Sequence, residues 1–135
     1  MKLTTKSEYA CLALIDLSEH FEKGMVKAED IAKRKNIPKK YLEHILLLLN
    51  KAGYVRSKRG TDGGHGLSKS PEHVSVAEII RLMDGALAPV ESVSKYFYHN
   101  TPIEQSKALM SLMLDVRDYT SRKLENTTFA DLIKG

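Results

Sequence analysis

The side chains best suited to chemistry in this sequence are basic, and they gather in the middle of the chain. Residues 27–69 hold eleven lysines and arginines against four aspartates and glutamates, a net charge of +7. The remaining residues hold 10 basic and 13 acidic side chains, so the whole chain carries +4. A basic segment between slightly acidic ends indicates a surface for a polyanion. A lysine-rich solvated surface is the alternative, and charge alone does not exclude it.

The elements expected within this segment favour nucleic acid. They are, in chain order, a short helix over 28–35, a break at Asn36-Ile37, a helix that opens with Pro38 and ends at Ala52-Gly53, a basic strand over 54–59, a glycine-rich turn over 60–64 and a returning strand over 65–68. Two helices joined by a tight turn predict a helix-turn-helix. A basic hairpin directly after it makes this a winged helix.

In a winged helix the second helix enters the major groove with its first turns toward the base edges. We expect Lys39, Lys40 and Tyr41 to contact phosphates. Glu43 can accept a hydrogen bond from cytosine N4, and His44 can donate to guanine or to a phosphate. A surface salt bridge with Lys39 or Lys40 is the alternative role for Glu43.

The predicted wing adds contacts beside the helix. Arg59, next to the glycine-rich turn, can enter a narrow minor groove or simply neutralise a phosphate. The predicted DNA-binding residues are Lys33, Pro38, Lys39, Lys40, Tyr41, Glu43, His44, Lys58, Arg59 and Gly60.

Further helices are expected on both sides of this segment, over about 5–22 from a capping box at Thr5 and over 75–83 from another at Ser75. The sequence Thr101-Pro102-Ile103-Glu104 predicts the start of a long helix over 102–124, and a short helix follows within 128–133. The apolar face of the long helix is wider than a small winged helix covers, which favours a two-fold dimer on an inverted repeat. Packing against its own domain is the alternative. The predicted dimer residues are Leu109, Leu112, Met113, Val116 and Tyr119.

The chain therefore divides into a winged-helix domain over 1–84, a loop over 85–101 and a dimerisation segment over 102–135. The loop holds the densest aromatic stretch, and Tyr96, Tyr98 and His99 are candidates for sensing a small ligand, haem or a metal. A structural role is the simpler interpretation of His99. Cys11 is a buried inert thiol or, less simply, a redox sensor.

Other classes of protein find no support in the sequence. A single cysteine excludes a disulfide framework within the chain and a cysteine-rich metal site. No apolar run approaches the ~20 residues of a membrane-spanning helix. No phosphate loop, dinucleotide fingerprint or nucleophile elbow occurs. We expect a cytoplasmic protein that is not an enzyme and holds no cofactor.

Several short segments match a known pattern. They are Met1 to Ala10, Asp30-Ile31-Ala32, Tyr41-Leu42-Glu43, Ala52-Gly53-Tyr54-Val55, and Arg59-Gly60 with Gly63-Gly64. Through them the sequence resembles, from residue 1 to about 90, the bacterial winged-helix repressors that include the iron–sulfur-cluster regulator, the nitric-oxide sensor and the cysteine-metabolism repressor. The resemblance implies a homodimeric transcription regulator, with Tyr41 and Glu43 in the major groove and Arg59 in the minor groove.

Two departures from that family bear on function. Cluster-binding members carry three cysteines before the long helix, whereas this sequence has none between Glu91 and Glu104, so we expect no iron–sulfur cluster held in that manner. The family's Gly-Gly-Tyr-x-Leu is replaced by Gly63-Gly64-His65-Gly66-Leu67, which we expect to loosen the wing. The signal is left open between a small ligand at residues 91–101, a protein partner, thiol chemistry at Cys11, and no signal at all. A winged-helix module that binds an acidic protein is the alternative to a DNA-binding regulator.

Overall fold

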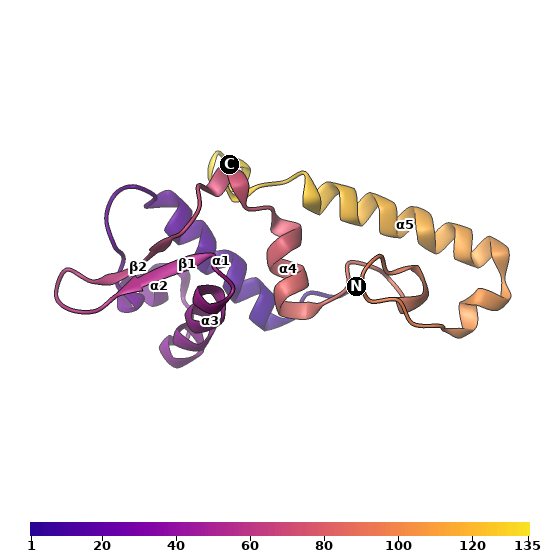
Figure 1. The fold of residues 1–135 in the computed structure, drawn as a ribbon, viewed down its shortest axis with the longest axis horizontal. Helices are drawn as coiled ribbons and strands as arrows, with labels where there is room; N and C mark the ends of the chain where they lie inside the picture. Colours follow the sequence, from indigo (N-terminus) through magenta and orange to yellow (C-terminus); the bar gives the residue numbers. More distant parts are fainter.

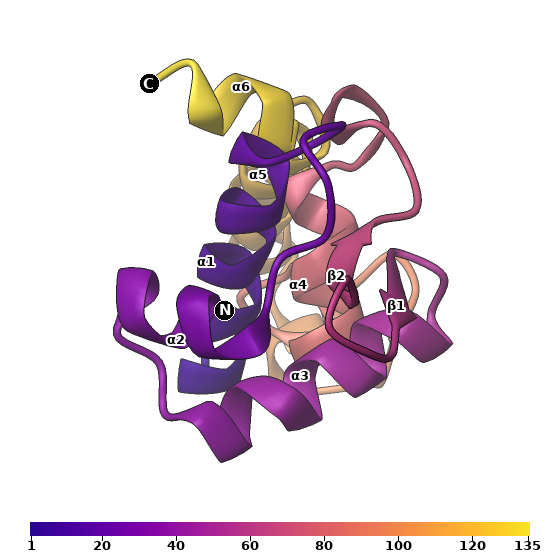
Figure 2. The ribbon, with the colours of Figure 1, turned by 90° about the vertical axis from the view of Figure 1, so that its left-hand side faces the viewer.

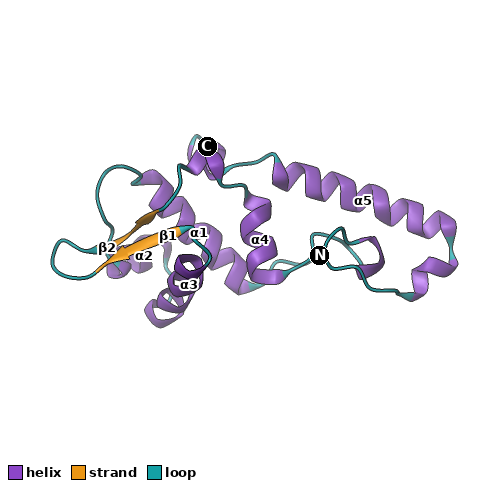
Figure 3. Cartoon of the chain, in the orientation of Figure 1, coloured by secondary structure: helices purple, strands orange, loops and turns teal.

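The computed structural model describes residues 1–135 as six α-helices and one two-stranded sheet (Figure 3). The elements are α1 (Thr5–Glu19), α2 (Ala28–Lys35), α3 (Lys39–Lys51), β1 (Val55–Lys58), β2 (Gly64–Leu67), α4 (Val76–Asp84), α5 (Lys107–Glu125) and α6 (Phe129–Ile133), with short 3₁₀ turns at Pro71–His73, Glu91–Val93 and Pro102–Gln105. The predicted mainly helical fold, with a two-stranded wing and a long C-terminal helix, is confirmed. None of these helices is both long and apolar enough to span a membrane.

The molecule is elongated (Figure 1). Helices α1 to α3 and the hairpin lie at one end, and α5 extends away from them alongside the loop that follows α4. Seen from the end, α1 stands in the middle with α2, α3, α4 and α6 around it (Figure 2). The core of this domain is therefore built on α1, and every other helix of the domain is positioned against it.

The apolar residues of α1 recur at helical spacing and are fully buried: Ala10, Ala13, Leu14 and Leu17. Helix α3 presents a matching face to them, made of Leu42, Ile45, Leu46 and Leu49. The strands add Val55 and Leu67, and α6 adds Phe129, which is 1% exposed. Because only one face of α3 packs against this core, its other faces are exposed to solvent or to a partner.

An ion pair between a buried carboxylate and a partly exposed guanidinium joins α1 to α2. The Asp16 side chain has no exposed surface, and the guanidinium of Arg34 donates to both of its carboxylate oxygens, from Nε at 2.8 Å and from Nη2 at 3.0 Å. Two parallel, charge-assisted hydrogen bonds fix both distance and orientation. They therefore set the angle at which the helix-turn-helix leaves α1.

The first helix starts and ends differently from the prediction. Its N-cap is Thr4, whose hydroxyl accepts from the Ser7 amide, and not Thr5. It ends at Glu19 instead of about 22, where His20 Nδ1 bonds the Asp16 carbonyl at 2.7 Å. The last carbonyls of a helix have no backbone donor within the helix, and the His20 side chain caps one of them here.

The predicted continuous helix over 102–124 is also wrong at its start. Residues 102–105 form a 3₁₀ turn, and α5 begins at Lys107 with Ser106 as its N-cap. The two side chains that should have capped a helix at 101 are engaged elsewhere, because Thr101 and Glu104 both bond Ser92. By contrast, the predicted capping box of Ser75 with Glu78 is present in α4.

The hairpin lies close against the segment before α2. Val26 and His65 exchange two backbone hydrogen bonds, of 2.8 and 2.7 Å. A Cβ on Gly64 would lie 2.6 Å from the Val26 carbonyl oxygen, and one on Gly63 would lie 2.1 Å from that of Lys58. Only glycine permits these approaches, so the Gly63-Gly64 pair is required by the shape of the wing.

We expect Arg34→Ala to lower the free energy of unfolding by about 1–2 kcal/mol, because it removes two charge-assisted hydrogen bonds from the buried Asp16 carboxylate and leaves it only His20, whose Nδ1 lies 3.4 Å from Oδ1. Arg34→Lys restores the charge but not the two-point contact, so it should recover part of the loss. Urea unfolding followed by circular dichroism measures both. Lys33→Ala, at an exposed position of the same helix, is the control and should change the stability little. A loss in Arg34→Ala no larger than in the control would contradict this role.

Candidate nucleic-acid interface

The predicted DNA-contacting side chains lie on the exposed faces of α3. Lys40, Tyr41, Glu43 and His44 are all exposed in the first two turns of the helix. Pro38 is the N-cap and not the first helical residue, so the helix proper opens at Lys39. The order of side chains along the helix is therefore as expected, shifted by one position at its start.

The Glu43 side chain has no hydrogen bond or ion pair. Lys39, one of the partners considered for it, is paired instead with Glu29 of α2, with Nζ and Oε1 2.8 Å apart. Hydrogen bonding between these two side chains lowers the pKa of Glu29 and raises that of Lys39. The Glu43 carboxylate thus remains open to an outside donor.

The ring of Tyr41 packs against α1 on its inner side. Its ring meets that of Tyr9 of α1 edge to face, with ring centroids 5.4 Å apart and planes at 74°. Its side chain is 38% exposed, so one part packs on the domain and the other faces outward. A ring held in this way has few orientations to lose when a partner binds it.

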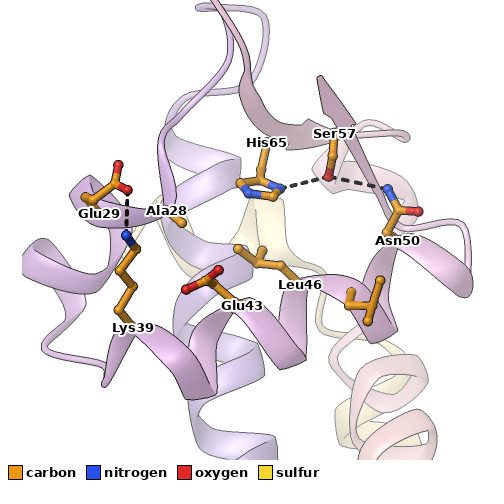
Figure 4. Close-up of a pocket in the computed structure, with 9 residues that line it drawn as sticks. Ala28, Glu29, Lys39, Glu43, Leu46, Asn50, Ser57 and His65 are labelled. Carbon is orange, nitrogen blue, oxygen red and sulfur yellow. Dashed lines mark hydrogen bonds and ion pairs between the residues drawn. The ribbon is translucent and has the colours of Figure 1, made fainter. Parts of the chain in front are cut away.

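A groove of about 350 Å³ separates α3 from the wing (Figure 4). Three polar side chains form a chain along its wall: Asn50 Nδ2 lies 3.4 Å from Ser57 Oγ, which lies 2.8 Å from Nδ1 of His65. Burial lowers the pKa of His65. Sequence reasoning missed Asn50, Ser57 and His65, although the pairing of Ser57 with His65 across the hairpin follows from the strand register.

The wing carries its charges outward. Arg56, Lys58 and Arg59 are exposed. Gly60 follows Arg59 with φ +102°, and its carbonyl accepts a hydrogen bond from the Lys27 ammonium at 2.7 Å. The predicted DNA-contacting residues of helix and wing therefore belong to two adjoining elements, with the groove between them.

The loop predicted to sense a signal is tied together by polar contacts. Buried Ser92 bonds Thr101 and Glu104, and the Tyr98 hydroxyl donates to the same Glu104 carboxylate at 2.9 Å. The latter bond lowers the pKa of Glu104 and raises that of Tyr98. His99 is exposed, and only its backbone takes part in these contacts.

Helix α5 has one covered face and one uncovered face. Arg81 of α4 reaches Glu125 at 2.6 Å, Arg117 donates to the Val93 carbonyl and Ser121 to the Leu87 carbonyl. Of the predicted dimer residues, Met113 is half-buried beside this covered face. The other four are exposed and recur with spacings of three, four and three: Leu109, Leu112, Val116 and Tyr119.

The chain matches known proteins along its whole length. A family described as Rrf2, iron-dependent transcriptional regulator, matches residues 3–135. The HTH-type transcriptional regulator CymR of Bacillus subtilis is 31% identical over 98% of this chain and 89% of its own. An Rrf2-like HTH-type regulator of Rhodobacter capsulatus is 43% identical over 71% of this chain and 66% of its own, just under two thirds of that protein.

Solved structures agree with these matches. The structure of Bacillus subtilis CymR, described as a global cysteine regulator, superposes with a TM-score of 0.81 at 29% identity, over 99% of this chain and 97% of that one. That of T. potens IscR superposes with a TM-score of 0.77 at 30% identity, over 99% and 87% of the two chains.

The residues of this chain do not fit an iron–sulfur cluster. The single cysteine, Cys11, lies in α1. In the loop before α5, the hydroxyl of Ser92 and the carboxylate of Glu104 are already bonded to each other. No three His, Cys, Asp or Glu side chains converge anywhere in the chain to hold a metal ion.

Cys11 is expected to react slowly. Burial raises the pKa of its thiol from 9.0 to about 11, and the nearby charge of Asp84 adds to this. Because the thiolate is the reactive form, alkylation by iodoacetamide at pH 8 should be about 100-fold slower in the native protein than in urea. Mass spectrometry of quenched samples measures the two rates. Equal rates would support the alternative of a redox-sensing thiol.

Proposed function

This chain belongs to the Rrf2 family of transcriptional regulators, and we propose that it acts as a homodimeric repressor that reads an inverted repeat in double-stranded DNA. The role is regulatory and not enzymatic, and we place it in the cytoplasm, where such a regulator meets its DNA. The observation that carries the proposal is the open carboxylate of Glu43 on an exposed helix face, beside a basic wing.

Helix α3 supplies the proposed base contacts. With Leu42, Ile45 and Leu46 anchored in the core, the helix can lie in the major groove as a rigid unit. Glu43 would then accept from cytosine N4, and His44 would donate to guanine or phosphate. Each base contact of good geometry is worth about 1–3 kcal/mol of discrimination.

The basic side chains supply the proposed phosphate contacts. Lys33, Lys40 and Lys58 are exposed and have no carboxylate partner. Lys39 would have to exchange Glu29 for a phosphate. Arg59 at the wing tip would enter the minor groove, where A/T-rich sequences attract a guanidinium. Phosphate contacts position the protein, and Glu43 and Arg59 give it sequence preference.

The proposed dimer forms through the exposed stripe of α5. A spacing of three and four residues is the pattern by which helices pair along a seam. A second copy of the same stripe is self-complementary under two-fold symmetry. Such a dimer would place its two α3 helices about 34 Å apart, one turn of DNA. An effector, either a small molecule or a protein, would act through the loop over 85–101.

The proposal is tested by selecting random-sequence duplexes with the purified protein at about 150 mM salt, where unspecific phosphate contacts are already weak. We expect an enriched inverted repeat. On that repeat, six to eight phosphate contacts per dimer should give a slope of about −6 when the logarithm of the binding constant is plotted against the logarithm of the salt concentration. Binding that remains equal on all sequences would favour the module that binds an acidic protein instead.

Glu43→Gln tests the base contact. The amide offers a donor as well as an acceptor, so discrimination between cytosine and other bases at one position of each half-site should fall by about 1–3 kcal/mol. Competition binding with single-base variants of the selected site measures it. Glu72→Gln, which removes the same charge at an exposed position outside α3, is the control and should keep the preference. Unchanged discrimination in Glu43→Gln would remove Glu43 from base reading.

Leu112→Asp tests the dimer. Two carboxylates facing each other in an apolar seam should shift the protein from dimer to monomer, as seen by light scattering at micromolar concentration. Ser111→Asp, on an adjoining exposed position of the same helix, is the control and should remain a dimer. A Leu112→Asp protein that is still dimeric would show that another surface pairs the subunits.

A further inference from the structure

Lys27 occupies an unusual position for a lysine. It is the N-cap of α2, where an oxygen-bearing side chain would accept a free amide of the first turn. A lysine has no acceptor, and α2 accordingly has no side-chain cap. The Lys27 side chain instead leaves the helix and reaches the wing, where its Nζ lies 2.7 Å from the Gly60 carbonyl oxygen.

That carbonyl is the one that closes the turn at the wing tip. It also accepts the amide of Gly63 at 3.0 Å, so both of its lone pairs have a donor. Gly60 adopts φ +102°, a conformation that glycine reaches freely and leaves as freely. The Lys27 ammonium therefore restrains Gly60, a residue with a flexible backbone that directly follows Arg59 in the wing tip.

The contact from Lys27 continues a contact made by its neighbour. Val26 exchanges two backbone hydrogen bonds with His65 on the returning strand. Residues 26 and 27 thus attach the hairpin at two places, one in its second strand and one at its tip. The first sets how the hairpin packs, and the second sets where the tip lies.

We propose that Lys27 is a positioning residue that anchors the wing tip, so that Arg59 is held ready for the minor groove. The inference rests on the proposed function and deepens it. Lys27 acts through the Gly60 carbonyl and does not contact a phosphate. A tip fixed before binding loses less freedom on the DNA, so the affinity gained by Arg59 is greater.

The anchor is tested first without DNA. Exchange of the Gly63 amide, followed by NMR, should be about five-fold faster in Lys27→Met, which keeps the length of the side chain but has no donor. Lys27→Arg restores a donor and should restore slow exchange. Lys58→Met, which removes an exposed charge from β1, is the matched control and should leave Gly63 unchanged. Equal exchange in Lys27→Met and the wild type would overturn the anchor.

Binding to the selected duplex then separates positioning from phosphate binding. Lys27→Met should weaken binding about five-fold on A/T-rich flanks and less on G/C-rich flanks, with the salt dependence unchanged. Lys58→Met should instead reduce the salt dependence by about 0.9 for each phosphate that the variant no longer neutralises. In an Arg59→Ala background, Lys27→Met should have almost no further effect, because the anchor acts through Arg59.

Two results would overturn the proposal at this stage. A salt dependence in Lys27→Met that falls as in Lys58→Met would make Lys27 a phosphate-binding residue. Full additivity with Arg59→Ala would show that the two side chains act separately. A wild type that selects no DNA, while Gly63 still responds to Lys27→Met, would instead refute the proposed function and leave the anchor standing.

Discussion

Asp16 is a charged side chain without exposed surface in the middle of α1, and the arrangement of the whole helix-turn-helix depends on how that charge is compensated. The compensation comes mainly from Arg34, near the end of α2, and His20 Nδ1 lies 3.4 Å from Oδ1 of the same carboxylate. Two residues further on, Asn36 takes a left-handed conformation, with φ 52°, and turns the chain into α3. The position of α3 is therefore set from both sides, by its own apolar face against the core and by an ion pair at the end of the preceding helix.

A second constraint acts at the other end of the molecule. The loop between α4 and α5 has no cysteine to hold a cluster, so its shape must come from the side chains it has. Ser92 is buried at its centre and shares hydrogen bonds with Thr101 and Glu104. Arg117 of α5 donates to the Val93 carbonyl and fastens this loop to the long helix. Local polar contacts thus close this segment without a metal group.

Much of the fold could be predicted from sequence, because the strongest signals are local. The bounds of α2, the termination of α4 at Gly85 and the capping box at Ser75 each depend on a few neighbouring residues. The failures have the opposite origin. Thr101 and Glu104 have the pattern of a helix start, but both bond Ser92, which lies nine and twelve positions earlier in the chain. Likewise the anchoring role of Lys27 depends on Gly60, 33 residues later, which no local pattern reveals.

The placement of the candidate side chains was predictable to the same extent. The exposed order of Lys40, Tyr41, Glu43 and His44 follows from helical spacing once Leu42 and Ile45 are assigned to the core. What spacing does not supply is the choice among partners, and here Glu29 rather than Glu43 pairs with Lys39. Surface carboxylates within reach of one lysine differ little in energy, so only the three-dimensional placement of α2 decides between them.

The packing of α6 has a consequence for how the protein matures during synthesis. Phe129 is buried against the first helix of the chain, its amide donates to the Val74 carbonyl, and the Thr127 carbonyl accepts from the Val76 amide. The DNA-binding domain is therefore completed by residues made after the long helix. On the ribosome α5 emerges while that domain still lacks part of its core. If α5 pairs two copies as proposed, its apolar stripe is available to a neighbouring nascent chain before either chain carries a finished winged-helix domain.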